Sequence, residues 1–181
     1  MKGIIFTEFM ELVEREFGLE LLDRVLADAD DQGIYTSVGS YDHKDLVKLI
    51  VSLSKETGIA PEALQTVFGK ATFMNLYKSV PESANLKSCK NCFQFIRLVE
   101  EHIHLEVKKL YGDANPPKFV FISETETVLE FDYLSARCMA HVCLGLIEGC
   151  ADFFDQSLRV EMDPKDGSGD TVRFVVTLNE A

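Results

Sequence analysis

The sequence predicts an α+β fold: a helical N-terminal half, then a C-terminal half built on an antiparallel sheet of about four strands. Three observations predict it. Apolar residues recur at three- and four-residue steps over residues 3–111, which is typical of helices with one buried face. Beyond residue 117, short segments rich in Phe, Val and Ile alternate with polar turns, as in hairpins. Pro116 and Pro117 separate the two patterns, because neither can donate to a backbone ladder.

The elements follow in order along the chain. Helices are expected at residues 3–16, 19–27, 44–57 and 61–77, with an acidic, Gly-containing loop at 28–42 and a connection at 80–90. Pro61 suits the first turn of its helix. One long, uninterrupted helix is expected at 91–111. Strands at 118–123 and 128–133 then form a hairpin, a helix spans 138–154, and strands at 158–162 and 172–178 form a second hairpin across 164–169.

Composition limits the class of protein. The 181 residues, 46% of them hydrophobic, suffice for one domain with a sizeable core or for two small lobes. A formal charge of −12 argues against a general binder of nucleic acid or of anionic membranes. No apolar run approaches the roughly 20 residues of a membrane span, so we expect a soluble, cytoplasmic protein. The usual enzyme signatures are missing, and we expect no catalytic activity.

Two histidines lie on the long helix expected at 91–111. His102 and His104 flank Ile103 on opposite edges of the apolar stripe, each about 100° away from it. Periodicity alone therefore does not choose between them as a ligand. The ordinary interpretation is that both are partly exposed or satisfied at the edge of a core.

A second group of polar residues closes the first hairpin. In extended backbone Tyr133, Ser135 and Arg137 would project to one side, and a phenol, a hydroxyl and a guanidinium aimed together suit a carboxylate. The alternative assigns Tyr133 to the sheet, makes Ser135 the cap of the next helix and leaves Arg137 solvated.

Five cysteines allow a thiol hypothesis. Cys89 and Cys92 have C-x-x-C spacing, and together with Cys138 and Cys143 they would form a redox or zinc switch. A further alternative is a binding module whose Phe-rich interior holds an apolar ligand and whose Arg137 binds its carboxylate.

Taken together, the helical histidine, the Pro-Pro pair and Tyr-x-Ser-x-Arg resemble the haem nitric oxide/oxygen-binding (H-NOX) domains, particularly stand-alone bacterial ones. These are related to the haem domain of soluble guanylate cyclase. The resemblance covers essentially the whole chain, from Met1-Lys2-Gly3-Ile4-Ile5 to Leu144-Gly145-Leu146-Ile147-Glu148-Gly149 and beyond. It implies a single domain over 1–181, with a distal helical subdomain over about 1–60, a proximal subdomain over about 61–181, and haem b (iron protoporphyrin IX) between them.

The resemblance also implies roles for individual residues. His104 stands 29 positions before Tyr133, the spacing of the family's proximal iron ligand, so His102 becomes a neighbour on the helix. Tyr133, Ser135 and Arg137 would hold the haem propionates. The positions that would contact the macrocycle are Pro117, which would distort it, and the apolar residues Ile5, Phe73, Val142 and Leu146.

Gas selectivity is implied by Val142. Relatives that bind oxygen stably carry a tyrosine nine residues beyond the motif tyrosine, and here that position is valine. His141 lies about 100° around the helix and is a poor substitute. The resemblance thus implies a sensor that binds nitric oxide and CO at ferrous haem. It would signal to a separate histidine kinase or cyclic-di-GMP enzyme (a diguanylate cyclase or phosphodiesterase).

Overall fold

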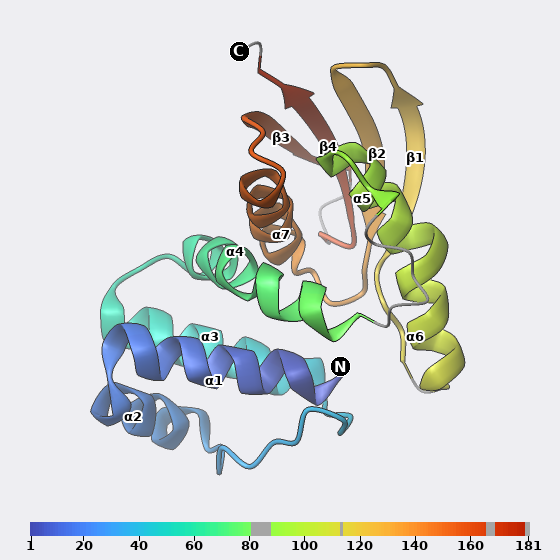
Figure 1. Ribbon diagram of the computed structural model, residues 1–181. Coiled ribbons are helices and arrows are strands. Elements are labelled where there is room, and N and C mark those ends of the chain that lie inside the picture. Colours follow the sequence, from blue (N-terminus) through green and yellow to red (C-terminus); the bar gives the residue numbers. More distant parts are fainter. Residues whose placement is uncertain (81–87, 113, 166–168, 180–181) are drawn as a thin grey trace.

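The computed structural model describes residues 1–80, 88–112, 114–165 and 169–179, and it confirms the α+β fold (Figure 1). Four helices form the N-terminal half: α1 (Gly3–Phe17), α2 (Leu19–Ala29), α3 (His43–Thr57) and α4 (Pro61–Ser79). The second half contains α5 (Cys92–Leu98), the π-helix η3 (Val99–Ile103), α6 (His104–Leu110), β1 (Lys118–Glu124), β2 (Val128–Leu134), α7 (Ala140–Phe153), β3 (Leu158–Pro164) and β4 (Thr171–Leu178). Most of the connection expected at 80–90 and the middle of the turn expected at 164–169 lie outside the described residues.

Local sequence accounts for several helix ends. The Asp42 side chain accepts a hydrogen bond from the Lys44 amide at the start of α3, and Gly58 ends that helix at φ 71°, a conformation that glycine adopts without strain. Pro61 occupies the first turn of α4, as predicted. The Asn91 side chain accepts from the Gln94 amide and so caps α5.

The helix expected over 91–111 is present as α5, η3 and α6, but it is not regular throughout. The segment contains a π-turn, η3, after which the His104 amide donates to the carbonyl of Val99, five residues earlier. A π-turn inserts one residue into the helix without needing Gly or Pro, so a pattern of apolar residues does not reveal it. The insertion also changes which residues share a face with His104.

The two predicted hairpins are confirmed and join into one four-stranded antiparallel sheet of order β1-β2-β4-β3. Central strands β2 and β4 pair in register, with Phe131 opposite Phe174. Alternate residues of both strands are buried under the helices. Helix α7 begins at Ala140, not at 138, because Cys138 adopts φ 52° and its amide closes a turn onto the Ser135 carbonyl.

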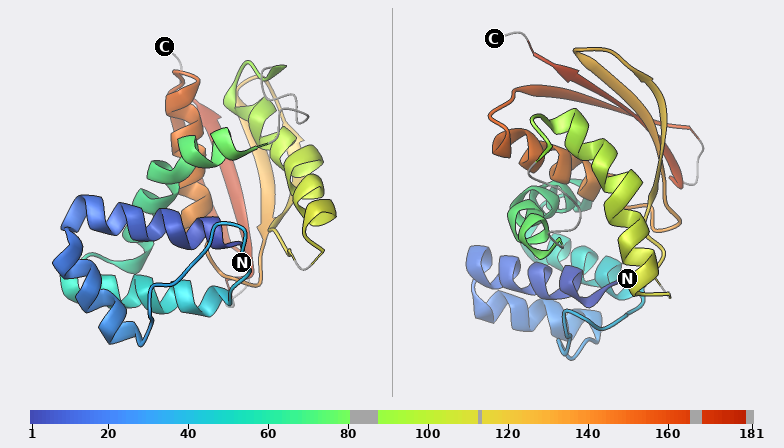
Figure 2. Two further views of the ribbon diagram at one scale, coloured as in Figure 1. Left: turned by 60° about the horizontal axis from the view of Figure 1, so that its bottom comes forward. Right: turned by 45° about the vertical axis from the view of Figure 1, so that its right-hand side comes forward.

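Two apolar clusters fill the molecule, and helix α4 contributes to both. One joins α1, α2 and α3 with Leu64 and Phe68 of α4. The other joins the buried face of the sheet with α5, α7 and Phe73 of α4. In both views of Figure 2 the helices of the first cluster lie apart from the sheet, with α4 and α7 between them. The space between the clusters is therefore bounded by residues distant in the sequence.

Glycines let α4 and α7 approach closely. A Cβ added at Gly145 would lie 2.0 Å from the Thr66 carbonyl oxygen, and one at Gly69 would lie 2.2 Å from the Val142 carbonyl oxygen. Both distances are too short for any side chain, so the two helix backbones are in direct contact. This contact fixes α7 relative to α4.

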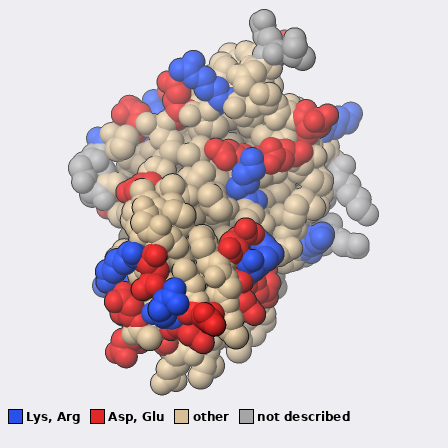
Figure 3. Space-filling model, turned by 90° about the vertical axis from the view of Figure 1, so that its left-hand side faces the viewer, with Lys and Arg blue, Asp and Glu red and all other residues tan. Residues whose placement is uncertain are grey.

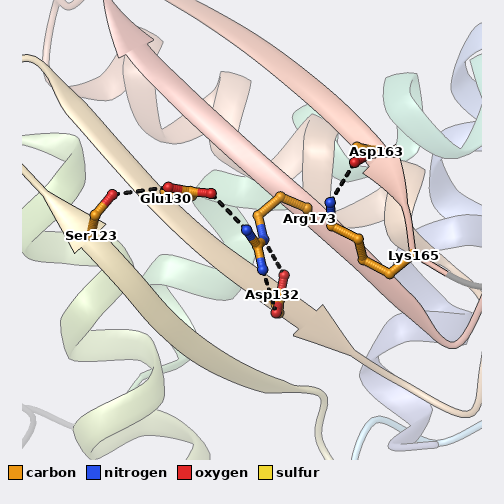
Figure 4. A network of polar contacts seen from close by, with 6 residues as sticks. All are labelled: Ser123, Glu130, Asp132, Asp163, Lys165 and Arg173. Atoms are coloured by element: carbon orange, nitrogen blue, oxygen red, sulfur yellow. Dashed lines mark hydrogen bonds and ion pairs between the residues drawn. The ribbon is translucent and has the colours of Figure 1, made fainter.

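Charged side chains cover the outer face of the sheet. Arg173 donates from Nη2 to Asp132 at 3.0 Å and from Nη1 to Glu130 at 2.7 Å, and Ser123 donates to Glu130 at 3.0 Å (Figure 4). The Arg173 guanidinium lowers the pKa of Asp132. Elsewhere on the surface basic and acidic side chains are interspersed, as on the face that Figure 3 shows. Within the described ranges no helix is both long and apolar enough to cross a bilayer.

Candidate functional site

A cavity of about 540 Å³ lies between the two apolar clusters. This volume falls in the range of roughly 300–1,000 Å³ typical of cavities that enclose small ligands and cofactors. Eight of the nine candidate site residues line it: Ile5, Phe73, His104, Pro117, Tyr133, Arg137, Val142 and Leu146. They come from α1, α4, α6, β2, α7 and the segments on either side of the first hairpin. The ninth, Ser135, is not among the described lining residues.

His104 presents a largely buried imidazole to the cavity, with 14% of its side chain exposed. His102, by contrast, is exposed. Burial lowers the pKa of His104, and the nearby Glu100 carboxylate only partly opposes this shift. The neutral imidazole is therefore favoured, which is the form that binds a metal. Its Nδ1 lies 2.9 Å from Glu100 Oε2, so Nε2 is the nitrogen available as a ligand.

Glu100 was missed in the sequence. Its Oε2 accepts hydrogen bonds both from His104 Nδ1 and from the backbone amide of Phe119 at 3.0 Å. The signal was present, because a carboxylate four residues before a histidine shares its helical face.

The extended arrangement expected for Tyr133, Ser135 and Arg137 is wrong. Strand β2 ends at Leu134, and Ser135 begins a turn in which its hydroxyl accepts from the Arg137 amide at 3.3 Å. The alternative that Ser135 caps the next helix is also wrong, since Met139 holds the cap position of α7 and makes no side-chain cap. The turn nevertheless brings Tyr133 and Arg137 to the same cavity.

Arg137 is a half-buried cation at the cavity. Burial lowers the pKa of its guanidinium, and burial raises the pKa of the Tyr133 phenol. No carboxylate among the described residues forms an ion pair with Arg137. A desolvated guanidinium without an acidic partner favours binding of an anionic group, and its planar fork suits a carboxylate.

The remaining candidate residues give the cavity apolar walls. Pro117 stands at the start of the first hairpin, and Ile5 belongs to α1. Val142 and Leu146 lie on successive turns of α7, and Phe73 comes from α4. His141, next to Val142, is not among the described residues that line the cavity.

The cysteines do not gather as the thiol hypothesis requires. Cys138 is exposed in the turn before α7, whereas Cys143 is buried within that helix. Cys92 instead interacts with Cys150, and burial together with this neighbour raises the pKa of the Cys150 thiol. In the part of the chain that the structure describes, no three His, Cys, Asp or Glu side chains are placed to hold a metal ion between them.

Comparison with known proteins identifies the family. The sequence profile described as Haem-NO-binding (HNOB) matches residues 2–162, most of the chain. The chain belongs to the Haem-NO-binding, or H-NOX, family. A search of curated proteins found no match.

Solved H-NOX structures agree with this assignment. The unliganded Fe(II) H-NOX protein from K. algicida, as its A71G mutant, is 35% identical, with a TM-score of 0.92 over 99% of this chain and 97% of that one. The H-NOX from Shewanella woodyi, solved with IWP-051 in the Fe(II)CO state, is 38% identical, with a TM-score of 0.80 over 98% and 94%. The S. oneidensis H-NOX in the Fe(II)NO state shares the fold at 22% identity, with a TM-score of 0.87 over 99% and 100%.

The cavity of this H-NOX chain fits haem chemically. Haem combines a flat apolar ring, an iron that accepts an imidazole nitrogen, and two carboxylates. The cavity offers apolar walls, the imidazole of His104, and the Arg137 guanidinium, which has no acidic partner among the described residues. Each part of the cofactor thus has a matching group.

Proposed function

We propose that this H-NOX chain is a haem-based gas sensor that binds nitric oxide at ferrous haem b. The observation that carries the proposal is the meeting of His104 and Arg137 in one apolar cavity of about 540 Å³. His104 Nε2 coordinates the iron, and Arg137 binds the propionates with help from Tyr133 and Ser135. Pro117, Ile5, Phe73, Val142 and Leu146 contact the macrocycle.

His104 would hold the haem, and the haem would supply the iron that binds nitric oxide or CO. Val142 places no hydrogen-bond donor on α7 at the position where oxygen-binding relatives carry a tyrosine. Bound oxygen needs such a donor, whereas nitric oxide binds ferrous iron without one. We therefore propose that the haem-loaded protein binds nitric oxide in preference to oxygen.

Signalling would proceed through the central helix. His104, the first residue of α6, would hold the haem, and the haem would supply the site for nitric oxide. Loss of this hold on His104 would free the segment formed by α5, η3 and α6. The helical subdomain over about 1–60 and the remainder over about 61–181 then have two relative arrangements that a partner can distinguish. We propose a cytoplasmic, non-enzymatic sensor that reports to a histidine kinase or a cyclic-di-GMP enzyme.

The test is an absorption spectrum of the purified protein. We expect an intense Soret band, and in the ferrous protein a shift of this band when nitric oxide is added. Exposure of the ferrous protein to air should give no stable oxygen complex. Absence of a Soret band after reconstitution with haem would overturn the proposal and favour an apolar carboxylate as the ligand.

A further inference from the structure

Glu100 holds the imidazole of His104 from outside the cavity. The side chain of His104 is 14% exposed and that of Glu100 is 23% exposed. The hydrogen bond between them joins His104 Nδ1 to Glu100 Oε2 at 2.9 Å. His104 lines the cavity, whereas Glu100 is not among its described lining residues. Because a carboxylate only accepts, Nδ1 carries the proton and Nε2 carries the lone pair.

Strand β1 fixes the Glu100 carboxylate in turn. The amide of Phe119 donates to the same oxygen, Oε2, at 3.0 Å. The Phe119 ring lies edge-on to the imidazole, with ring centroids 5.3 Å apart and planes at 72°. One residue of β1 therefore restricts both members of the pair, and neither side chain can turn without losing a contact.

The π-turn provides the third observation. Glu100 lies within η3, and His104 is the first residue after it. A π-turn is rare within a helix and is frequently found at functional sites. Here the distortion coincides with the residues that place Glu100 beside the imidazole.

We propose that Glu100 is a positioning residue that orients His104 and strengthens its bond to the haem iron. The inference rests on the proposed function, since it concerns a bond to that cofactor. A carboxylate that accepts from Nδ1–H increases the basicity of the imidazole and locks its tautomer and ring orientation. No proton is transferred and no bond is broken. Glu100 thereby sets how readily nitric oxide releases His104, and with it the threshold of the sensor.

The test compares three variants of the haem-loaded protein. Glu100→Ala removes the acceptor, and Glu100→Gln retains an oxygen acceptor without the charge. Glu101→Ala is the matched control, because Glu101 is the adjacent, exposed carboxylate of the same π-turn and faces Arg97 at 3.7 Å. The readouts are the iron–histidine stretching frequency of the ferrous protein by resonance Raman spectroscopy, the ferric/ferrous midpoint potential, and the rate of haem loss.

We expect Glu100→Ala to lower the stretching frequency, raise the midpoint potential and speed haem loss by about 10-fold, at the lower end of the roughly 10–100-fold typical of such outer partners. Glu100→Gln should fall between Glu100→Ala and the wild type. Glu101→Ala should match the wild type in all three. A role confined to holding the helix on β1 would change the unfolding temperature but leave the stretching frequency unchanged.

The outcomes separate this inference from the proposed function. If the wild type binds haem through His104 and Glu100→Ala keeps the wild-type stretching frequency, the inference fails and the function stands. If the wild type binds no haem, both fail.

Discussion

Arg137 is a cation at the cavity without an acidic partner among the described residues. The residue is half-buried there. We expect Arg137→Ala to weaken haem binding by roughly 2–5 kcal/mol, the cost of cutting one side of a buried charge pair. Tyr133→Phe and Ser135→Ala should each cost less, and the effects should not add, because all three groups serve one ligand. Haem-transfer kinetics provide the measurement.

The haem-free protein supplies the control for Arg137. Since the guanidinium has no acidic partner in the part of the chain that the structure describes, Arg137→Ala should leave the unfolding temperature of haem-free protein unchanged or slightly raised. Unaltered haem affinity in Arg137→Ala would remove this residue from the site.

Val142 carries the prediction about gas selectivity. Val142→Tyr places a phenol where it can donate to a ligand on the iron, an interaction of about 1 kcal/mol if well aligned. We expect the oxygen complex to live several-fold longer than in the wild type, as measured by stopped-flow mixing of ferrous protein with oxygen. Val142→Phe is the matched control, because it adds the ring without the hydroxyl. A long-lived oxygen complex in the wild type would contradict the nitric-oxide-selective assignment.

At the scale of residues, the sequence predicted which side chains line the cavity, but it did not predict how the backbone brings them there. Tyr133 and Arg137 do reach one cavity, but through a turn that begins at Ser135 and not along an extended strand. Apolar periodicity placed His102 and His104 symmetrically, and only the folded chain exposes one and buries the other. The spacing of Glu100 and His104 suggests their contact, but only the folded chain shows that the Phe119 amide, 19 residues away, holds the Glu100 carboxylate.

At the scale of elements, the α4–α7 contact depends on glycine. Gly145→Ala would place a Cβ 2.0 Å from the Thr66 carbonyl oxygen, so the two helix backbones must separate. We expect a loss of about 1–3 kcal/mol, which lowers the unfolding temperature by roughly 2–4 °C per kcal/mol in a chain of this size. Gly112→Ala is the control, since nothing lies within 4 Å of its Cβ position. Equal unfolding temperatures for the two variants would contradict the close contact.

The outer face of the sheet predicts a pH dependence. Arg173 holds the pKa of Asp132 below its ordinary value, so this carboxylate stabilises the fold above its unfolded-state pKa of about 4. That stability is lost as pH falls through the depressed folded-state pKa. Arg173→Leu should therefore be less stable than the wild type at neutral pH. The difference between their free energies of unfolding should become smaller as the pH is lowered. Urea unfolding at several pH values measures it.

Arg159→Leu is the control for the pH series, because Arg159 pairs with Glu161 in an exposed position of β3. A difference in free energy of unfolding between the wild type and Arg173→Leu that stays constant with pH would refute the electrostatic account.

Among the elements, the hairpins and most helices could be predicted from local pattern and turn chemistry. The π-turn η3 and the start of α7 could not, because apolar spacing does not reveal a π-turn or the local turn at Cys138 that delays α7.

At the scale of the whole molecule, the cavity lies between two apolar clusters that share helix α4. Its walls come from α1, α4, α6 and α7 and from the ends of the first hairpin, so no local pattern could predict its volume or its position. Motif spacing predicted haem as the ligand of this cavity only through the resemblance to a family. The arrangement also explains how an event at His104 would reach both parts of the molecule.

Replacement of the proposed iron ligand tests the central claim most directly. We expect His104→Gly to lose haem during purification and to regain its ferrous Soret band only when imidazole is added, because the vacated site accepts a free ligand. His102→Gly should retain the wild-type ratio of haem to protein without imidazole, since the His102 side chain is exposed. Both substitutions place glycine in the helix at the same cost of about 1 kcal/mol. Haem retention in His104→Gly without imidazole, or haem loss in His102→Gly, would contradict the account.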